Sequence, residues 1–220
     1  MNTFEAPLLT PSKAPLTVIS DGLGQDSATL VALALEDSAF RRRYVQGDLL
    51  VVSSDTGDEY TETTAYLQRK KALLAERNVT FVHLTPDMGF HSPAWQSLYH
   101  QWARNNTIGG VGFSSTCSPN LKTEVIYRFL NHLLAQRYGY VERQGRSSKA
   151  ALYGYRQDFG PLRVMIGFSA GEERRVCAAP QRYVQDTIER AFPLIDLGLS
   201  RQGCQDVTRH LGHEVPTPSN

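Results

Sequence analysis

The sequence predicts an α/β protein built on an open, mostly parallel twisted sheet with helices on its faces. Residues 16–20, 49–53 and 80–84 form short apolar runs that are bounded by polar or turn-forming residues. Continuous runs of this length are typical of strands that are buried on both faces of a parallel sheet. Longer stretches with helical spacing separate the runs, and strands that alternate with helices indicate βαβ units.

The other elements follow from apolar periodicity and from turn-forming residues. Residues 122–138 carry an apolar stripe, and Gly139 follows as a stop signal. Residues 162–168 read as a further strand. The Gly, Ser and Asn content of residues 105–117 predicts a loop, and the polar, basic and aromatic residues 144–160 predict a hairpin or a mobile loop. We expect further helices at residues 27–35, 62–77, 93–105 and 200–211.

Length and composition suit one domain. The chain has 220 residues and a formal net charge of +1, which gives no global argument for a nucleic-acid or membrane partner. We expect a leader at residues 1–15, the domain at 16–215 with a basic and aromatic hairpin or loop insertion at 137–163, and a tail at 216–220. The sequence has no signal-peptide pattern and no apolar run long enough to span a membrane, so we expect a cytoplasmic protein.

The sharpest motif is Ser20-Asp21-Gly22-Leu23-Gly24-Gln25-Asp26-Ser27, between the first strand and the first helix. Glycines let a backbone approach phosphate closely, and the amides of the loop and of the helix start would donate to an anion. The motif is neither a Walker A loop nor a dinucleotide fingerprint. Taken alone, it reads equally well as a plain turn in which Asp26 or Ser27 caps the helix.

A second polar segment, Asp55-Thr56-Gly57, follows the second strand. Ligands of open α/β sheets bind outside the carboxyl ends of the strands, so both segments occupy the expected edge. Asp55 could hold Mg²⁺ or bind ribose hydroxyls, or the segment is only a turn with Thr61 capping the next helix. The residues that we assign to nucleotide binding are Ser20, Gly22, Leu23, Gly24, Gln25, Asp26, Ser27, Asp55, Thr56 and Gly57.

Further segments strengthen this interpretation. Residues 115–122 (STCSPNLK), 166–175 (IGFSAGEERR) and 193–196 (PLID) follow in order after the two loops. Together the five segments resemble motifs of the PP-loop ATP pyrophosphatases, in the branch similar to phosphoadenosine-phosphosulfate reductases: Ser-x-Gly-Gly-Gly-x-Asp-Ser, Asp-Thr-Gly…Glu-Thr, Cys-Thr-x-x-Leu-Lys and Ile-Gly-Ile-Ser-x-Asp-Glu-x-x-Arg. Leu23 stands where the first of these has its middle glycine.

The resemblance implies a HUP-like, PP-loop sheet that binds ATP or a related adenine nucleotide with Mg²⁺. In most members a substrate oxygen attacks the α-phosphate, pyrophosphate leaves, and sulfur or nitrogen then attacks the adenylated substrate. Such chemistry needs positioning and charge neutralisation. The catalytic residues that we expect are Asp26, Ser27, Lys122 and Arg174, with Arg175 as another cation near the phosphates. Alternatively, Lys122 only flanks a helix start and one of the two arginines faces solvent.

The cysteines mark where the chain departs from relatives in this family. The C-terminal Glu-Cys-Gly-x-His segment of the phosphosulfate reductases is absent, and Cys117, Cys177 and Cys204 cannot supply the four ligands of the iron–sulfur cluster in DndC-type DNA-phosphorothioation pyrophosphatases. We therefore expect no iron–sulfur cluster, as in the SspD type. Cys117 precedes a helix, which would lower its thiol pKa and suit a sulfur acceptor, or it is an unreactive structural cysteine. We expect Cys177 and Cys204 in the core.

The stretch from Arg137 to Arg163 interleaves basic residues with tyrosines. Basic side chains neutralise phosphates and aromatic rings stack on bases, so the stretch could grip DNA or tRNA. It could equally be a solvated hairpin, or an interface for a cysteine desulfurase or another sulfur donor. The side chains that we assign to nucleic-acid contact are Arg143, Arg146, Lys149 and Arg156.

Three functions are compatible with these features. The leading hypothesis is an ATP pyrophosphatase that adenylates a substrate for sulfur insertion into nucleic acid, in DNA phosphorothioation or tRNA thiolation. The second is a reductase of a sulfonucleotide such as phosphoadenosine-phosphosulfate, and the missing C-terminal cysteine segment speaks against it. The third is a nucleotide-sensing or partner-binding module without turnover, which Leu23 in the glycine loop would favour.

Overall fold

The computed structural model describes residues 11–57, 59–105, 119–140, 148–176 and 180–217. Three residues of the predicted site, Cys117, Arg143 and Arg146, lie outside the described residues, as do Cys177, which was expected in the core, and residues 1–10 of the predicted leader.

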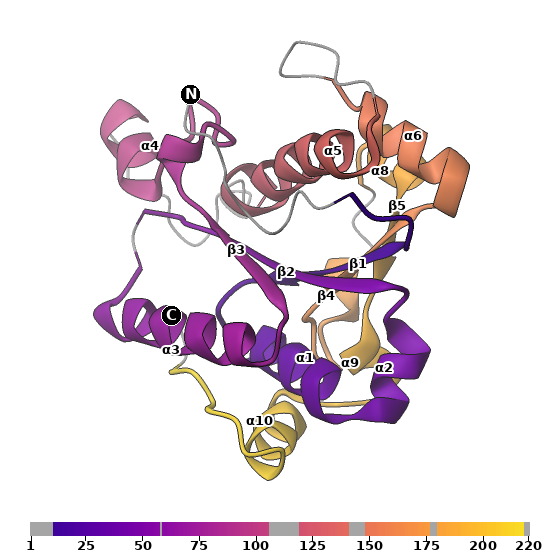
Figure 1. Cartoon of the computed structure of the whole chain (residues 1–220). Helices are drawn as coiled ribbons and strands as arrows, with labels where there is room; N and C mark the ends of the chain where they lie inside the picture. Colours follow the sequence, from indigo (N-terminus) through magenta and orange to yellow (C-terminus); the bar gives the residue numbers. More distant parts are fainter. Residues whose placement is uncertain (1–10, 58, 106–118, 141–147, 177–179, 218–220) are drawn as a thin grey trace.

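The centre of the molecule is one sheet of five parallel strands in the order β3-β2-β1-β4-β5 (Figure 1). The strands are β1 (Leu16–Asp21), β2 (Asp48–Ser54), β3 (Thr80–Leu84), β4 (Leu162–Ile166) and β5 (Ile188–Ala191). All four pairings are parallel, with Val18 of β1 opposite Leu50 of β2 and Val164 of β4. The predicted α/β class is confirmed, and the sheet is parallel throughout.

Helices cover both faces of the sheet (Figure 1). One layer contains α5 (Glu124–Tyr138), α6 (Ala150–Phe159) and α8 (Arg182–Thr187), and the other contains α1 (Gln25–Glu36), α2 (Ser38–Tyr44), α3 (Thr61–Glu76) and α10 (Arg201–His210). The shorter elements are η2 (Pro86–Met88), α4 (Leu98–Asn105), the π-helical turn η3 (Pro119–Thr123), α7 (Glu173–Val176) and α9 (Pro193–Asp196). Within the described parts of the chain, no helix is both long and apolar enough to cross a lipid bilayer.

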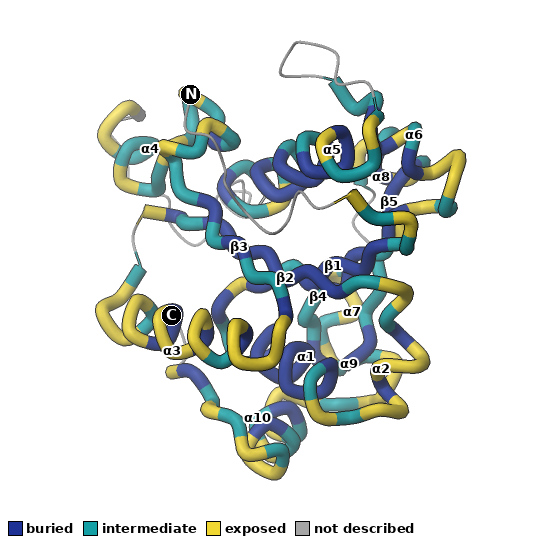
Figure 2. Tube along the Cα trace, viewed as in Figure 1, coloured by how far each residue is buried: buried dark blue, intermediate teal, exposed yellow. Residues whose placement is uncertain are grey.

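The two layers bury two apolar cores (Figure 2). Val18, Leu50 and Val164 face the core under α5 and α6, whereas Ile19 and Val51 face the core that includes residues of α1 and α2. Both sides of the central strands are therefore dry, which explains their uninterrupted apolar sequences. Gly139 ends α5 in a left-handed conformation with φ of 72°, as its place after the apolar stripe predicts.

The prediction of a hairpin or mobile loop over residues 144–160, within an insertion at 137–163, is wrong for residues 150–159, which form α6. Ala151, Leu152 and Tyr155 are buried on one face of this helix. The Tyr155 ring packs against Tyr138 at a centroid distance of 5.4 Å, and its hydroxyl accepts a hydrogen bond from the amide of Leu16 at 2.7 Å. Aromatic residues that read as surface features are here the contact between α6, α5 and β1.

Several element boundaries also differ from the predictions. α1 begins at Gln25 with Gly24 as N-cap, so neither Asp26 nor Ser27 caps it; both lie in its first turn. Tyr60, and not Thr61, is the N-cap of α3. The helix predicted at residues 93–105 begins only at Leu98, and the strand predicted at 162–168 ends at Ile166. Helices α2 and α8 and strand β5 were not anticipated.

Candidate functional site

A cavity of about 570 Å³ lies at the carboxyl ends of β1 and β4. It brings together the glycine loop between β1 and α1, the start of α5, the segment after β4, residues around α8, and the first residue of α10. Its lining residues are Ser20, Gly22, Gly24, Gln25, Asp26, Ser27, Lys122, Thr123, Glu124, Ile126, Tyr127, Ile166, Gly167, Phe168, Arg175, Pro180, Gln181, Val184, Arg190 and Arg201.

The glycine loop faces this cavity with open space above its two glycines. A side chain added at Gly22 or Gly24 would meet no atom within 4 Å. Leu23, between them, adopts a left-handed backbone with φ of 58°, and its side chain is buried away from the lining. The leucine therefore takes the strained conformation that a glycine would favour, but it does not fill the space over the loop.

A buried ion pair between Asp21 and Lys70 stabilises the glycine loop. Asp21 accepts a hydrogen bond from the amide of Leu23 at 2.8 Å, and its other carboxylate oxygen lies 2.5 Å from Nζ of Lys70 in α3. Burial opposes the charge on Lys70, but Asp21 and the hydroxyl of Tyr66 outweigh it and raise the lysine's pKa. The sequence analysis missed Lys70, although a lysine in helical register with the buried Tyr66 and Leu74 is a detectable signal.

Asp26 and Ser27 occupy the first turn of α1, where the helix dipole favours anions. The Ser27 hydroxyl donates to the carbonyl of Gly24 at 3.0 Å. Asp26 is only 9 % exposed, and its Oδ1 has no hydrogen-bond partner among the described residues. Burial raises the pKa of Asp26 and Glu172 raises it further, while Ser169 and Arg201 act in the opposite direction.

Gly167 allows the end of β4 to touch the start of α1. A Cβ at this position would lie 2.7 Å from the backbone nitrogen of Ser27 and 2.9 Å from the carbonyl carbon of Asp26. Such distances to backbone atoms leave no room for a side chain. The glycine in this segment is therefore explained by close packing against the first turn of α1.

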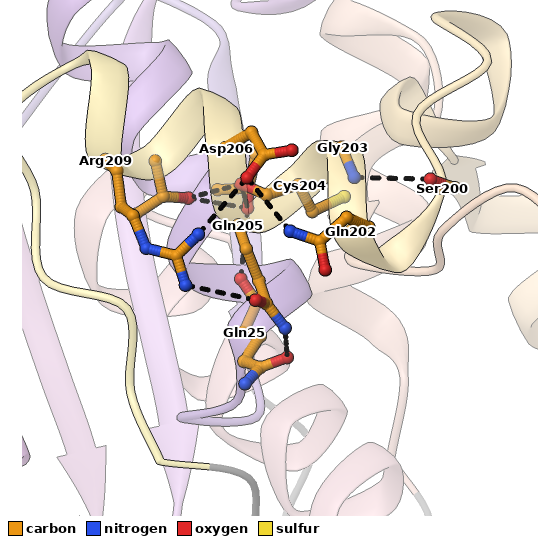
Figure 3. A network of polar contacts seen from close by, with 10 residues as sticks. Gln25, Ser200, Gln202, Gly203, Cys204, Gln205, Asp206 and Arg209 are labelled. Carbon is orange, nitrogen blue, oxygen red and sulfur yellow. Dashed lines mark hydrogen bonds and ion pairs between the residues drawn. The ribbon is translucent and has the colours of Figure 1, made fainter.

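Helix α10 fixes the start of α1 from outside the sheet (Figure 3). The Gln205 amide donates to Oε1 of Gln25 at 2.9 Å, and Gln25 in turn donates to the carbonyl of Pro216 at 3.3 Å. One turn further along α1, the hydroxyls of Thr29 and Thr208 are 2.8 Å apart. Cys204 lies on α10 and is fully buried, as predicted for a core cysteine. Burial raises the pKa of its thiol to about 11.

The cations that line the cavity differ in part from those expected. Lys122 lines it, and Arg175 does so in place of Arg174, although both arginines are exposed. Arg175 also pairs with Glu172 at 2.7 Å. Counting the ten-residue motif from Ile166 puts its final arginine at 175, a signal that could have identified this residue. Arg190 of β5 and Arg201 of α10 were missed, because no motif covers them.

The second polar segment is absent from the cavity lining. Asp55 accepts a hydrogen bond from the amide of Gly57 at 2.7 Å, and Thr56 donates from its hydroxyl to Glu59 at 2.7 Å. A side chain on Gly57 would approach Cβ of Ser97 to 2.2 Å. These contacts match the alternative in which the segment is a packed turn, and its roles in nucleotide and Mg²⁺ binding stay predictions.

No group of three or more His, Cys, Asp or Glu side chains suitable for a metal ion occurs within the described ranges. This arrangement is compatible with Mg²⁺ bound together with phosphates, because such ions use one or two carboxylates and keep substrate oxygens and waters as other ligands. Asp26, whose buried Oδ1 has no hydrogen-bond partner among the described residues, is a carboxylate of that kind in the cavity lining.

Two of the side chains predicted to contact nucleic acid, Lys149 and Arg156, lie in the described part of the basic stretch, and Lys149 contacts another residue of the protein. Nζ of Lys149 lies 4.3 Å above the ring of Tyr183, and burial lowers its pKa. The Tyr183 hydroxyl donates to Glu124, a cavity residue, at 3.1 Å. Arg156 is exposed near the end of α6. The predicted contacts with nucleic acid stay predictions.

His210 is exposed, whereas His213 is half-buried and its Nε2 lies 3.0 Å from Oε1 of Glu36. Comparison of the chain with models of known protein families, and with curated proteins, found no match.

Proposed function

We propose that this chain is a cytoplasmic ATP pyrophosphatase that cleaves ATP between the α and β phosphates and adenylates a substrate. One observation carries the proposal: the glycine loop and the first turn of α1 line one cavity together with several cations. The first turn also holds Asp26, whose buried Oδ1 has no hydrogen-bond partner among the described residues. Amides at a helix start bind phosphate oxygens, and the surrounding cations would neutralise their charge.

Each group has a role in this proposal. The amides of the glycine loop and the Ser27 hydroxyl would hold phosphate oxygens, with Lys122 and Arg175 neutralising their charge. Asp26 would bind Mg²⁺, which when present supplies charge neutralisation to the phosphates. Arg201, beside Asp26, would offset the negative charge of that carboxylate. The chain itself would therefore contribute orientation and electrostatics and would need no nucleophile of its own.

The acceptor is the less constrained half of the proposal. The resemblance to PP-loop enzymes and the basic stretch favour a nucleic acid that is activated for sulfur insertion, in DNA phosphorothioation or tRNA thiolation, with a cysteine desulfurase or another donor supplying the sulfur. Cys117 stays a candidate sulfur acceptor, outside the described residues. The argument for a non-catalytic module loses force because Leu23 does not obstruct the cavity.

The test is product analysis after incubation with Mg²⁺ and ATP, with and without DNA and tRNA. We expect AMP and pyrophosphate, or an adenylated acceptor and pyrophosphate. Asp26→Ala and Ser27→Ala should abolish pyrophosphate release while the proteins stay folded. Ser38→Ala, at the exposed start of α2, is the matched control and should retain activity. Binding of ATP without any cleavage would favour the sensing module, and ADP with orthophosphate would contradict the proposal.

A further inference from the structure

The cavity has a second wall whose chemistry differs from that of the glycine loop. It is formed by Ile126 and Tyr127 of α5 and Val184 of α8, three side chains that line the cavity and are each at most 3 % exposed. We refer to these three residues as the apolar wall. Helices α5 and α8 cover the face of the sheet opposite to α1, so the cavity extends around the sheet edge from one face to the other (Figure 1). The apolar wall suits a ring-shaped group better than it suits a phosphate.

A carboxylate lies beside the apolar wall. Glu124, in the first turn of α5, also lines the cavity. The hydroxyl of Tyr183 and the side-chain amide of Gln181 both donate to its Oε1, at 3.1 Å and 3.0 Å, whereas its Oε2 makes no hydrogen bond within the described residues. The ring of Tyr183 also meets that of Tyr127 edge to face, with centroids 6.5 Å apart. An ionised carboxylate can only accept, so Oε2 requires a donor from a ligand.

The base of a nucleotide combines these two requirements, a flat ring and a polar edge. Residues 55–57 are absent from the lining of this cavity, so they offer no surface for the base there. We propose that the adenine of ATP packs against the apolar wall and that its exocyclic amino group donates to Oε2 of Glu124. The proposal rests on the proposed function and makes Glu124 a specificity-determining residue. A base with a carbonyl oxygen in place of the amino group would set two acceptors against each other.

Replacing Glu124 with glutamine should invert the preference. In Glu124→Gln the side chain has one acceptor oxygen, which the donors of Tyr183 and Gln181 would hold in the position of Oε1. The NH₂ group of the new amide would then take the position of Oε2. An amino group on the base would meet another donor there, whereas a carbonyl oxygen would accept from it.

Binding of three nucleoside triphosphates in the presence of Mg²⁺ measures this preference without turnover, if a methylene bridge between the α and β phosphates prevents release of pyrophosphate. The bases are adenine, unsubstituted purine, which lacks the amino group, and hypoxanthine, which carries a carbonyl oxygen in its place. We expect the wild type to bind the adenine compound at least about tenfold more tightly than the other two. Glu124→Gln should bind the hypoxanthine compound at least about threefold more tightly than the adenine compound. Glu76→Gln, at an exposed glutamate of α3, is the matched control and should behave as the wild type.

Equal binding of the adenine and purine compounds by the wild type would refute the assignment. This comparison uses the wild type alone, so it decides the question even if Glu124→Gln does not fold. A Glu124→Gln variant that weakens all three compounds by the same factor would show a purely structural role for Glu124. Absence of binding of all three would overturn both proposals. Failure of the proposed function alone would appear differently, as a wild type that prefers the adenine compound but releases no pyrophosphate from ATP.

Discussion

The two polar segments that follow β1 and β2 have similar compositions but opposite surroundings. In the segment after β1, Gly22 and Gly24 face open space and Asp26 retains an oxygen without a partner in the described structure. In the segment after β2, Gly57 packs against Ser97, and Asp55 is bonded to the amide of Gly57. Glycine and aspartate thus leave room for a ligand in the first segment and close a turn in the second.

The difference shows what a motif at a sheet edge can establish. Both segments are at carboxyl ends of strands, where ligands of parallel sheets bind. The first segment runs directly into α1, whose first-turn amides add an electropositive end, whereas residues 58–60 separate the second from α3; only the first lines the cavity. Position at the edge is therefore not sufficient; the polar groups must also lack partners within the protein.

Removing the ion pair between Lys70 and Asp21, which stabilises the first segment, should have the largest effect on stability. Lys70→Met would leave the buried carboxylate of Asp21 without its cation, which costs about 3–5 kcal/mol in the free energy of unfolding. Denaturant unfolding measures the loss. Asp21→Asn in the same protein should recover most of it, because the amide oxygen can still accept from Leu23. Lys71→Met, at an exposed neighbour in α3, should change stability by less than about 0.5 kcal/mol. Equal effects of the two lysine variants would refute the supporting role.

Filling the close contact between Gly167, after β4, and the first turn of α1 should have the second-largest effect on stability. Gly167→Ala would force a methyl group against the backbone of Ser27, with a loss of about 1–3 kcal/mol in stability. The first turn of α1 would also shift, so we expect ATP affinity to fall more than tenfold. Gly203→Ala in α10, where an added Cβ meets only ordinary contacts, is the control. Unchanged ATP binding in Gly167→Ala would contradict the placement of the phosphates.

The buried carboxyl group of Asp26 predicts a pH-dependent gain in stability when it is replaced by an amide. Because burial raises the pKa of Asp26 in the folded state, its ionised form destabilises the fold at neutral pH. Asp26→Asn should therefore raise the free energy of unfolding at pH 7 while it abolishes pyrophosphate release. The gain should shrink as the pH falls through the raised pKa towards the unfolded value, because the wild-type carboxyl then becomes neutral. A stability difference that is constant from pH 7 to pH 4 would exclude this cause.

The smallest effect should come from the second segment. Asp55→Ala removes a hydrogen bond within an exposed turn, so we expect a loss of about 0.5 kcal/mol or less in stability and a change below about twofold in ATP affinity. Titration of ATP in the presence of Mg²⁺ measures the second quantity. A tenfold loss would return Asp55 to the nucleotide or metal site and would end the contrast between the two segments.

The parts of the fold that the sequence predicts are those with a local signal. Residues 16–20 and 49–53 lie in buried central strands and residues 80–84 in an edge strand, and a continuous apolar run identifies each of the three. β5 was not predicted because it is an edge strand of only four residues, two of which are the charged Glu189 and Arg190. α6 was not predicted because Tyr155 and an alanine occupy some of its buried positions and lie among basic and polar residues, so that no clear apolar stripe marks the helix.

The residues of the site also fall into those that a local motif predicts and those that only the fold brings together. The glycine loop and Lys122 are contiguous with recognisable motifs and line the cavity. Lys70 and Arg201 reach the loop region from helices that the fold brings together, and spacing along the chain does not encode such contacts. The rings of Phe168 and Phe192, which stack with centroids 5.7 Å apart, likewise meet only because β4 and β5 are neighbours.

Hydrogen exchange with and without saturating Mg²⁺ and ATP tests the central claim most directly, because it reports on both segments in one experiment. The account predicts slower exchange of amides in residues 22–27, with the 55–57 segment exchanging at its ligand-free rate. Slower exchange at residues 55–57 alone, or no change at residues 22–27, would contradict the assignment of this cavity to the phosphates of ATP.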